Sequence, residues 1–222
     1  MNWDAGTYER VADPQAEWAD EIIARSGIRP GDSVLDAGCG GGRVTRKLLE
    51  LTPNVIAVDA DPNMVEKARE SLPESVAVLH QDLLELDVDE KVDVVFSCAV
   101  FHWITDHDRL FERLHAALKP GGRLVAQCGG KGNIAHVLGV AGGRSGRWLF
   151  AGAHETEERL ARAGFRQARA WLEPKPARPS DMEAFLATVV FHLDPDPRAT
   201  AARVAPQIDA VDYVRLNMEA TT

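Results

Sequence analysis

Short apolar runs alternate with helix-spaced apolar residues along the chain from residue 33 to residue 128. The runs have the length and composition of buried strands, and they lie at 34–35, 55–59, 76–79, 92–97 and 123–127. Between them, helical spacing is found in the segments 44–51 and 63–72 and in the segment that carries Leu110, Leu114 and Leu118. Repeated strand–helix units of this length predict a parallel sheet with helices on both faces.

Polar residues and prolines mark where several predicted helices begin. Asp61 followed by Pro62 is typical of a helix cap and a first-turn proline. Residues 105–108 and 180–183 have the spacing of a capping box, with Thr105 and Ser180 as the capping residues. Residues 119–122 predict a turn before the strand at 123–127.

The segments outside this alternation are less regular. Residues 15–26 carry Trp18, Ile22 and Ile23 at helical spacing and predict a helix, which either packs on the sheet or forms part of a lid. The end of the chain, 212–218, alternates with period two, and this pattern predicts an edge strand that faces solvent on one side. Between the strand at 123–127 and residue 212, the pattern indicates a glycine-rich segment at 129–146, a helix at 156–163, a strand at 166–172 and helices at 180–190 and 198–210.

Composition limits the class of partner. The chain has 222 residues, a formal net charge of −9 and a pI near 5.3, which disfavours nucleic acid and membrane surfaces as partners because both need a basic face. No apolar run approaches the length of a membrane span, and residues 1–10 do not resemble a signal peptide. The three cysteines show no metal-ligand pairing, so we expect a reducing cytoplasmic environment.

A glycine-rich turn follows the first predicted strand, in the stretch Asp36-Ala37-Gly38-Cys39-Gly40-Gly41-Gly42-Arg43. Turns of this kind, between a strand and a helix, bind nucleotide-like cofactors in open α/β sheets, because glycines let the backbone approach the ligand. The dinucleotide fingerprint needs a third glycine at position 43, where the chain has Arg43. The pattern that fits is an acid followed by alternate glycines at 38, 40 and 42.

This pattern is similar to the first motif of class I S-adenosylmethionine (SAM) dependent methyltransferases. The segments Phe101-His102-Trp103, 118–122, 127–134 and 212–217 resemble the trans-aconitate methyltransferase group. The resemblance implies SAM as the cofactor, a small-molecule methyl acceptor and a Rossmann-like α/β fold with seven mostly parallel strands and an antiparallel last strand. It also implies a single domain over residues 1–222, with a cofactor core at 33–128 and candidate lid or substrate elements at 1–30, 129–150 and 180–210.

Three acids follow three successive strands, and each has a proposed place around one nucleoside. Asp59 stands about twenty residues beyond the turn, where Rossmann-type folds bind a ribose; an acid there is otherwise a helix cap. In the methyltransferase family, an acid at the position of Asp82 accepts from the adenine amino group while the next N–H, here Leu83, donates to a ring nitrogen; a surface turn is the alternative. The remaining expected cofactor residues are Asp36, Gly38, Gly40, Ala60, Met64 and Cys98.

The segment after the fourth strand is expected to meet the sulfonium. His102 could act as a general base or only line the pocket, and a carboxylate acceptor would need no base. Trp103 could border the sulfonium or pack in the core. The other candidate acceptor residues are Arg144, Arg147, Trp148, Tyr213 and Arg215.

Metal dependence is not expected, because Asp106, His107 and Asp108 occupy a helix start, where acids are favoured anyway. The sequence therefore predicts a cytoplasmic SAM-dependent methyltransferase that acts on a small molecule, first of all on a carboxylate oxygen. Methylation of carbon or nitrogen and non-catalytic SAM binding remain open, and a nicotinamide-dependent reductase is disfavoured by Arg43. The oligomeric state is left open.

Overall fold

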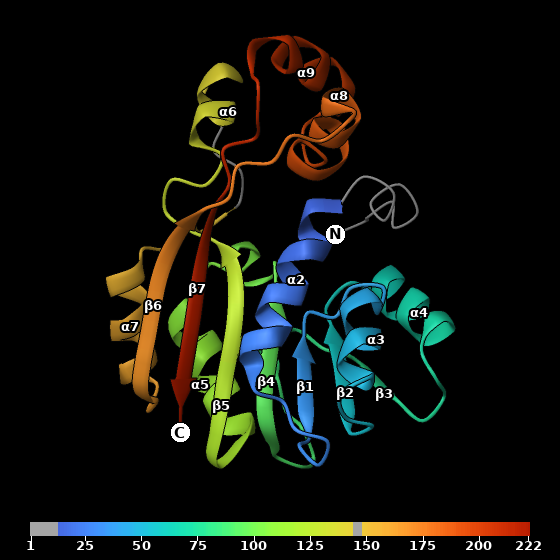
Figure 1. Cartoon of the computed structure of the whole chain (residues 1–222), viewed down its shortest axis with the longest axis vertical. Helices are drawn as coiled ribbons and strands as arrows, with labels where there is room; N and C mark the ends of the chain where they lie inside the picture. Colours follow the sequence, from blue (N-terminus) through green and yellow to red (C-terminus); the bar gives the residue numbers. More distant parts are fainter. Residues whose placement is uncertain (1–12, 144–147) are drawn as a thin grey trace.

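A seven-stranded sheet forms the centre of the computed structural model, which describes residues 13–143 and 148–222 (Figure 1). The strand order is β3-β2-β1-β4-β5-β7-β6. Strands β1 to β5 are parallel, and β7 is antiparallel to both of its neighbours. This confirms the predicted fold class. The strands are β1 (Val34–Ala37), β2 (Val55–Asp59), β3 (Ala77–His80), β4 (Val92–Cys98), β5 (Leu118–Gly129), β6 (Arg166–Pro174) and β7 (Val214–Thr221).

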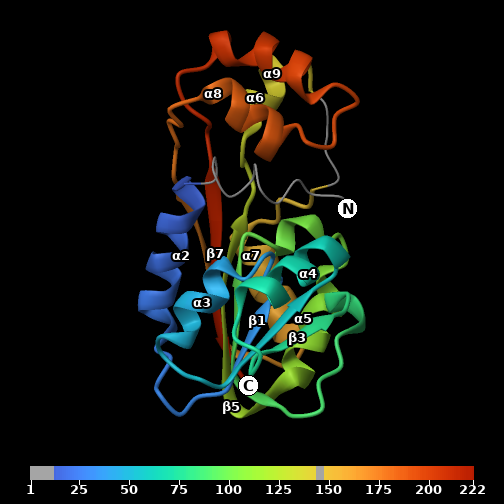
Figure 2. The ribbon, with the colours of Figure 1, turned by 90° about the vertical axis from the view of Figure 1, so that its right-hand side faces the viewer.

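Helices cover both faces of the sheet. Alternate strand residues point to opposite faces, so Val34 packs with Ile22 of α2, whereas the next residue, Leu35, packs with Phe111 of α5. Figure 2 shows α2 and α3 across the sheet from α5 and α7. None of the helices in the described ranges is long and apolar enough to cross a membrane. The helices against the sheet are α2 (Asp13–Ser26), α3 (Arg43–Leu49), α4 (Pro62–Ser71), α5 (His107–Ala117) and α7 (Ala153–Arg162).

The predicted helix starts agree with the structure to within one residue at three of the caps. Asp61 caps α4, and its Oδ1 accepts from the N–H of Asn63 (3.0 Å) and of Met64 (3.3 Å). At the other two starts the cap lies one residue later than predicted, at Asp106 and Asp181. An aspartate carboxylate is a strong acceptor for the amides of the first turn, and its charge favours the helix N-terminus.

The last strand differs from its prediction, because β7 is not an edge strand. It lies between β5 and β6, and β6 forms the edge. The polar members of its alternating pattern do not face solvent: Arg215 is 1% exposed and Asn217 is fully buried. They hydrogen-bond to Gln127 of β5, so the period-two pattern reflects a buried polar network.

Other boundaries also differ. β5 begins at Leu118 and includes the predicted turn, where Gly121 has a φ of +78°. The predicted helix at 180–190 is divided into α8 (Met182–Phe185) and a π-helical turn, η3 (Leu186–Val190). The helix predicted over 198–210 is α9 (Pro197–Val204), followed by a short 3-10 turn, η4 (Ala205–Gln207), which contains Pro206.

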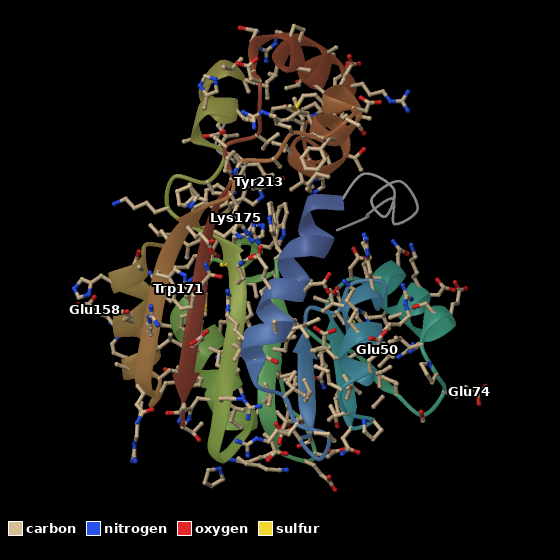
Figure 3. All side chains as sticks on the ribbon, viewed as in Figure 1. Glu50, Glu74, Glu158, Trp171, Lys175 and Tyr213 are labelled. Carbon is tan, nitrogen blue, oxygen red and sulfur yellow. The ribbon has the colours of Figure 1, made fainter. Side chains whose placement is uncertain are left out.

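A group of short helices stands above the carboxyl ends of the parallel strands (Figures 1 and 2). We call the segments 134–142 and 177–211 the cap; they contain α6 (Ala135–Val140), α8, η3 and α9. The cap has its own apolar core, which includes Phe185 and Val204 and continues into Trp18 of α2 and Tyr213. Figure 3 shows Tyr213 between the cap and the sheet. The cap is therefore packed on the sheet at the edge where the cofactor motif lies.

Candidate functional site

One cavity of about 370 Å³ lies at the carboxyl ends of the central strands and extends under the cap. Its size is that of a small-molecule site. His102, Trp103 and Tyr213 line it, whereas Arg144 and Arg147 lie outside the described residues. All nine predicted cofactor residues also line it: Asp36, Gly38, Gly40, Asp59, Ala60, Met64, Asp82, Leu83 and Cys98.

The glycine-rich turn needs glycine for two different reasons. Gly38 has a φ of +85°, and a Cβ added there would stand 2.3 Å from Cγ2 of Val100. Gly40 also has a positive φ, +54°, but a Cβ there would meet no protein atom within 4 Å. Gly38 therefore permits close packing of the turn on the segment after β4, and Gly40 leaves its backbone open to a ligand in the cavity.

The Asp59 carboxylate is held by backbone amides at the end of β2. Oδ2 accepts from the N–H of Gly40 (2.8 Å), and Oδ1 accepts from the N–H of Asp61 (2.9 Å). Burial raises the pKa of Asp59, and the two amides oppose that shift. Each carboxylate oxygen has a second lone pair, so Asp59 can still accept from two vicinal hydroxyls in the cavity.

Asp36 is a buried acid beside the same turn. Its Oδ2 accepts from Oγ1 of Thr45 (2.7 Å). Burial raises the pKa of Asp36 to about 7, and nearby Asp59 adds to the shift. A cationic ligand group in the cavity would favour the ionised form.

The position of Asp82 is compatible with both roles that the sequence left open. It is exposed and caps the 3-10 turn η1 (Leu83–Glu85), where its Oδ1 accepts from the N–H of Leu84 (2.9 Å). It also lines the cavity together with Leu83 and the buried Met64. One carboxylate oxygen of Asp82 thus makes the capping hydrogen bond of η1, and the other is available to a ligand.

His102 has a fixed tautomer. It lies in the short turn η2 (Phe101–Trp103), and the backbone N–H of Gly129 donates to its Nδ1 (3.3 Å). Because a backbone amide can only donate, Nδ1 carries no proton and the neutral ring is protonated at Nε2. Burial, together with the charge of Arg215 and the neighbouring His107, holds the pKa of His102 well below its usual range. The ring is therefore neutral.

Aromatic rings from two segments, η2 and residues 148–150, line the cavity, and His192 of the cap packs against one of them. Trp103 lies 5.7 Å from Trp148 and 5.3 Å from His192 of the cap, measured between ring centroids. Trp148 stacks on Phe150 at 5.7 Å, and Phe150 stacks on His102 at 6.0 Å. The sequence singled out Trp103 and Trp148, but nothing in the chain pattern linked Phe150 to them. The other lining residues that were missed include Asn133, Ile134, Val189 and Val190.

Arg215, a buried residue of β7, also lines the cavity. Its guanidinium is 4.7 Å from the ring centroid of Trp18 and 6.0 Å from that of Tyr213. Nε donates to Oε1 of Gln127 (3.2 Å), and Nη2 is buried without a hydrogen-bond partner. Within residues 13–143 and 148–222, no carboxylate forms a salt bridge with it.

The acids and histidine at the start of α5 contact protein groups. Asp106 caps the helix, Asp108 pairs with Arg162, and Nε2 of His107 bonds the carbonyl of Phe101 (2.9 Å). His107 thereby holds the turn that carries His102. Across the described segments, no group of three or more potential ligands is placed to hold a metal ion.

Comparison with known proteins agrees with this geometry. Residues 35–126 match the methyltransferase domain family. An uncharacterized methyltransferase of Schizosaccharomyces pombe is 30% identical over 182 residues, covering 73% of this chain and 70% of that protein. A trans-aconitate 2-methyltransferase of Rhizobium rhizogenes is 33% identical over 164 residues, covering 72% of this chain but only 63% of the relative.

A solved phosphoethanolamine N-methyltransferase 2 of Haemonchus contortus, in complex with SAM, shares the fold with a TM-score of 0.63. It is 22% identical, over 93% of this chain and 52% of that one. The fold, the turn and these relatives define a class of enzyme, the class I SAM-dependent methyltransferases. This chain belongs to that family, and its cofactor is SAM. The open backbone at Gly40 and the available lone pairs of Asp59 fit that cofactor.

Proposed function

We propose that the chain transfers the methyl group of SAM to a carboxylate oxygen of a small organic acid. The hydrogen bond from Gly129 to Nδ1 of His102 carries this proposal. It occupies the only nitrogen of the neutral ring that could take a proton, so His102 presents a donor. An acceptor that is already an anion needs no base, and a donor suits it.

The proposed cofactor contacts follow the strand order. Asp59 binds the ribose hydroxyls, Asp82 and the N–H of Leu83 bind the adenine edge, and Ala60 and Met64 contact its face. Asp36, the glycine-rich turn and Cys98 surround the methionine portion. All of these groups line the same cavity, which is the observation that supports the assignment.

The chemistry of the step balances without a proton. Bound SAM supplies a methyl group on a sulfonium: the carboxylate oxygen forms a bond to the methyl carbon, the carbon–sulfur bond breaks, and its electron pair stays on sulfur. The residues around the cavity then act by alignment and by exclusion of water. Trp103, Trp148 and Phe150 supply an apolar wall for both purposes.

The relatives support the acceptor class, since one is named a trans-aconitate 2-methyltransferase. Methylation of a small amine is the second candidate, and the aromatic wall favours it, because aromatic faces attract cations. The charge of Arg215, which has no carboxylate partner among the described residues, opposes a cationic acceptor.

The test is a panel of acceptors incubated with SAM carrying a labelled methyl group. The panel contains trans-aconitate, other small carboxylic acids, amines and phenols. We expect S-adenosylhomocysteine to form with an acid, together with an alkali-labile methyl ester identified by mass spectrometry. A methylated amine as the main product would contradict the carboxylate proposal. SAM binding without turnover on any acceptor would favour a non-catalytic role.

The organisation of the chain remains part of the proposal. We take residues 1–222 as one methyltransferase domain in which 1–30, 129–150 and 180–210 serve as lid or substrate elements. The packing of the cap over the cavity supports this for the described parts. The three free cysteines support a reducing, cytoplasmic environment.

A further inference from the structure

The guanidinium of Arg215 is a buried charged group that lines the cavity. The residue is 1% exposed and yet has no carboxylate partner among the described residues. Burying a charge costs several kcal/mol unless the charge is paired, and a buried ion normally has a counter-ion. Two aromatic rings and one amide oxygen offset part of this cost. The described residues thus place a cation at the cavity without supplying an anion to pair with it.

A hydrogen-bonded chain fixes one end of this guanidinium. Nε donates to Gln127, whose Nε2 donates to Oδ1 of Asn217 (2.8 Å). Oδ1 of Asn217 also accepts from Arg25 of α2. These bonds set the orientation of both amides, so Gln127 and Asn217 position Arg215. The guanidinium of Arg215 is therefore held at Nε, and its Nη2 has no hydrogen-bond acceptor among the described residues.

The place of Arg215 in the sheet separates it from the nucleoside. Strands lie about 4.8 Å apart, so β7 is roughly 19 Å from β2, which carries Asp59, and roughly 10 Å from β4. The expected position of the sulfonium is near the end of β4. Arg215 therefore lies beyond the sulfonium, on the side away from the ribose and beside Tyr213 and His102.

We propose that Arg215 binds an anionic group of the acceptor other than the carboxylate that is methylated. This inference rests on the proposed function. Methyl transfer consumes the charge of the reacting carboxylate, so a fixed cation paired with that oxygen would stabilise the ground state more than the transition state. A cation paired with a second acidic group holds the acceptor without this penalty. The acceptor then carries at least two acidic groups, and the product keeps one of them.

A second source of an anion for Arg215 is the carboxylate of the methionine portion of SAM. Binding measurements on the whole chain separate the two sources. Calorimetry measures the affinity for S-adenosylhomocysteine, and then the affinity of the loaded protein for succinate, glutarate and tricarballylate. The variants are Arg215→Gln, Arg215→Lys and, as a matched control, Arg169→Gln. Arg169 also lies over a tryptophan ring, that of Trp171 at 4.8 Å, but does not line the cavity.

We expect at least one of the acids to bind the loaded wild-type protein. Arg215→Gln should weaken that binding roughly 30-fold or more, because one partner of a buried charge pair is lost. Arg215→Lys should retain part of the affinity, since it keeps the charge without the fork. S-adenosylhomocysteine affinity should change less than about twofold, and Arg169→Gln should match the wild type in both measurements. Thermal unfolding confirms that each variant is folded.

Comparison of each diacid with its monoamide identifies the group that Arg215 binds. If an acid is turned over, Arg215→Gln should raise its KM far more than it lowers kcat, and the monoamide should be insensitive to the substitution. Equal losses for diacid and monoamide would overturn the inference, as would a loss of S-adenosylhomocysteine affinity alone. Failure of every acid to bind the loaded wild-type protein would also overturn it. Acid binding that depends on Arg215 without any turnover would contradict the proposed methyl transfer and leave this assignment intact.

Discussion

The two halves of the cavity are built differently. In the cofactor half, the acids Asp36 and Asp59 are held by neighbours within about twenty residues, mostly backbone amides at strand ends. In the proposed acceptor half, the lining comes from η2, residues 133–134 and 148–150, η3 and β7, and its ring and guanidinium contacts are between side chains. In the proposed assignment, cofactor binding thus depends on a local backbone turn, whereas acceptor choice depends on how distant segments pack. The largest effects on cofactor affinity are therefore expected at Asp59 and at the glycine-rich turn.

The largest loss of cofactor affinity is expected from Asp59→Asn. An amide cannot accept from both Gly40 and Asp61 as the carboxylate does, and it loses the charge-assisted bonds to the ribose. Two such bonds are worth about 3 kcal/mol together, so the S-adenosylhomocysteine affinity should fall roughly 100-fold. Calorimetry measures it. Glu66→Gln, an exposed acid of α4 outside the cavity, should have no effect. Unchanged affinity in Asp59→Asn would place the nucleoside elsewhere.

The two glycines of the turn should respond differently to alanine. Gly38→Ala drives a Cβ into Val100 at a φ of +85°, and we expect it to lower the free energy of unfolding by about 1–3 kcal/mol. Gly40→Ala has open space, so it should cost about 1 kcal/mol of stability while weakening S-adenosylhomocysteine binding more strongly. Denaturant unfolding and calorimetry measure the two quantities. If Gly38→Ala and Gly40→Ala weakened S-adenosylhomocysteine binding equally, the backbone of Gly40 would not face the cofactor.

A truncation in the aromatic wall should affect the acceptor alone. Trp148→Ala removes a ring that stacks on Phe150 and touches Trp103, and we expect the acceptor KM to rise about tenfold from the loss of about 1.4 kcal/mol of packing. S-adenosylhomocysteine affinity should stay within about twofold. Trp171→Ala, on β6 and outside the cavity, is the matched control (Figure 3). A loss of cofactor affinity in Trp148→Ala would mean that the two halves are not separate.

A last prediction concerns the pH dependence of stability. Asp36 has a pKa of about 7 in the folded chain, raised by burial from an ordinary value of 3.8. The folded state therefore holds this proton where the unfolded state has lost it, and stability falls as the pH rises between these two values. Asp36→Asn removes the contribution, so its melting temperature should gain on that of the wild type from about pH 4 to about pH 7.

Asp93 provides a control of opposite sign. Hydrogen bonds from Lys119 and Ser33 hold the pKa of Asp93 below its ordinary value, and its stabilisation is lost as the pH falls. Asp93→Asn should therefore differ from the wild type at neutral pH and converge with it in acid. If the melting temperatures of Asp36→Asn and the wild type changed in parallel over the whole pH range, the raised pKa of Asp36 would be contradicted.

The sequence was sufficient for the part of the fold built from local signals. The order of strands and helices from residue 33 to residue 128 follows from apolar runs, glycines and caps, and all nine predicted cofactor residues line one cavity. The position of β7 was not predictable in the same way. Its alternating polar residues look solvent-facing, and only the packing of α2 against the sheet shows that Arg215 and Asn217 are buried.

The acceptor half also escaped prediction for a physical reason. Phe150 lies 48 positions from His102, and the ring contact between them depends on the whole path of the intervening chain. The tautomer of His102 depends on the amide of Gly129, which reaches it through β5. Residue types alone left His102 open as a base or a pocket residue, and the hydrogen bond is what favours a donor.

The most direct test of the separate cofactor and acceptor halves of the cavity is a crystal structure of the chain with S-adenosylhomocysteine and a bound dicarboxylic acid. The account predicts the adenosine beside Asp59 and Asp82, and one carboxylate of the acid within hydrogen-bonding distance of Arg215, with the other carboxylate facing the sulfur. An adenosine away from Asp59, or a cofactor carboxylate paired with Arg215, would contradict it.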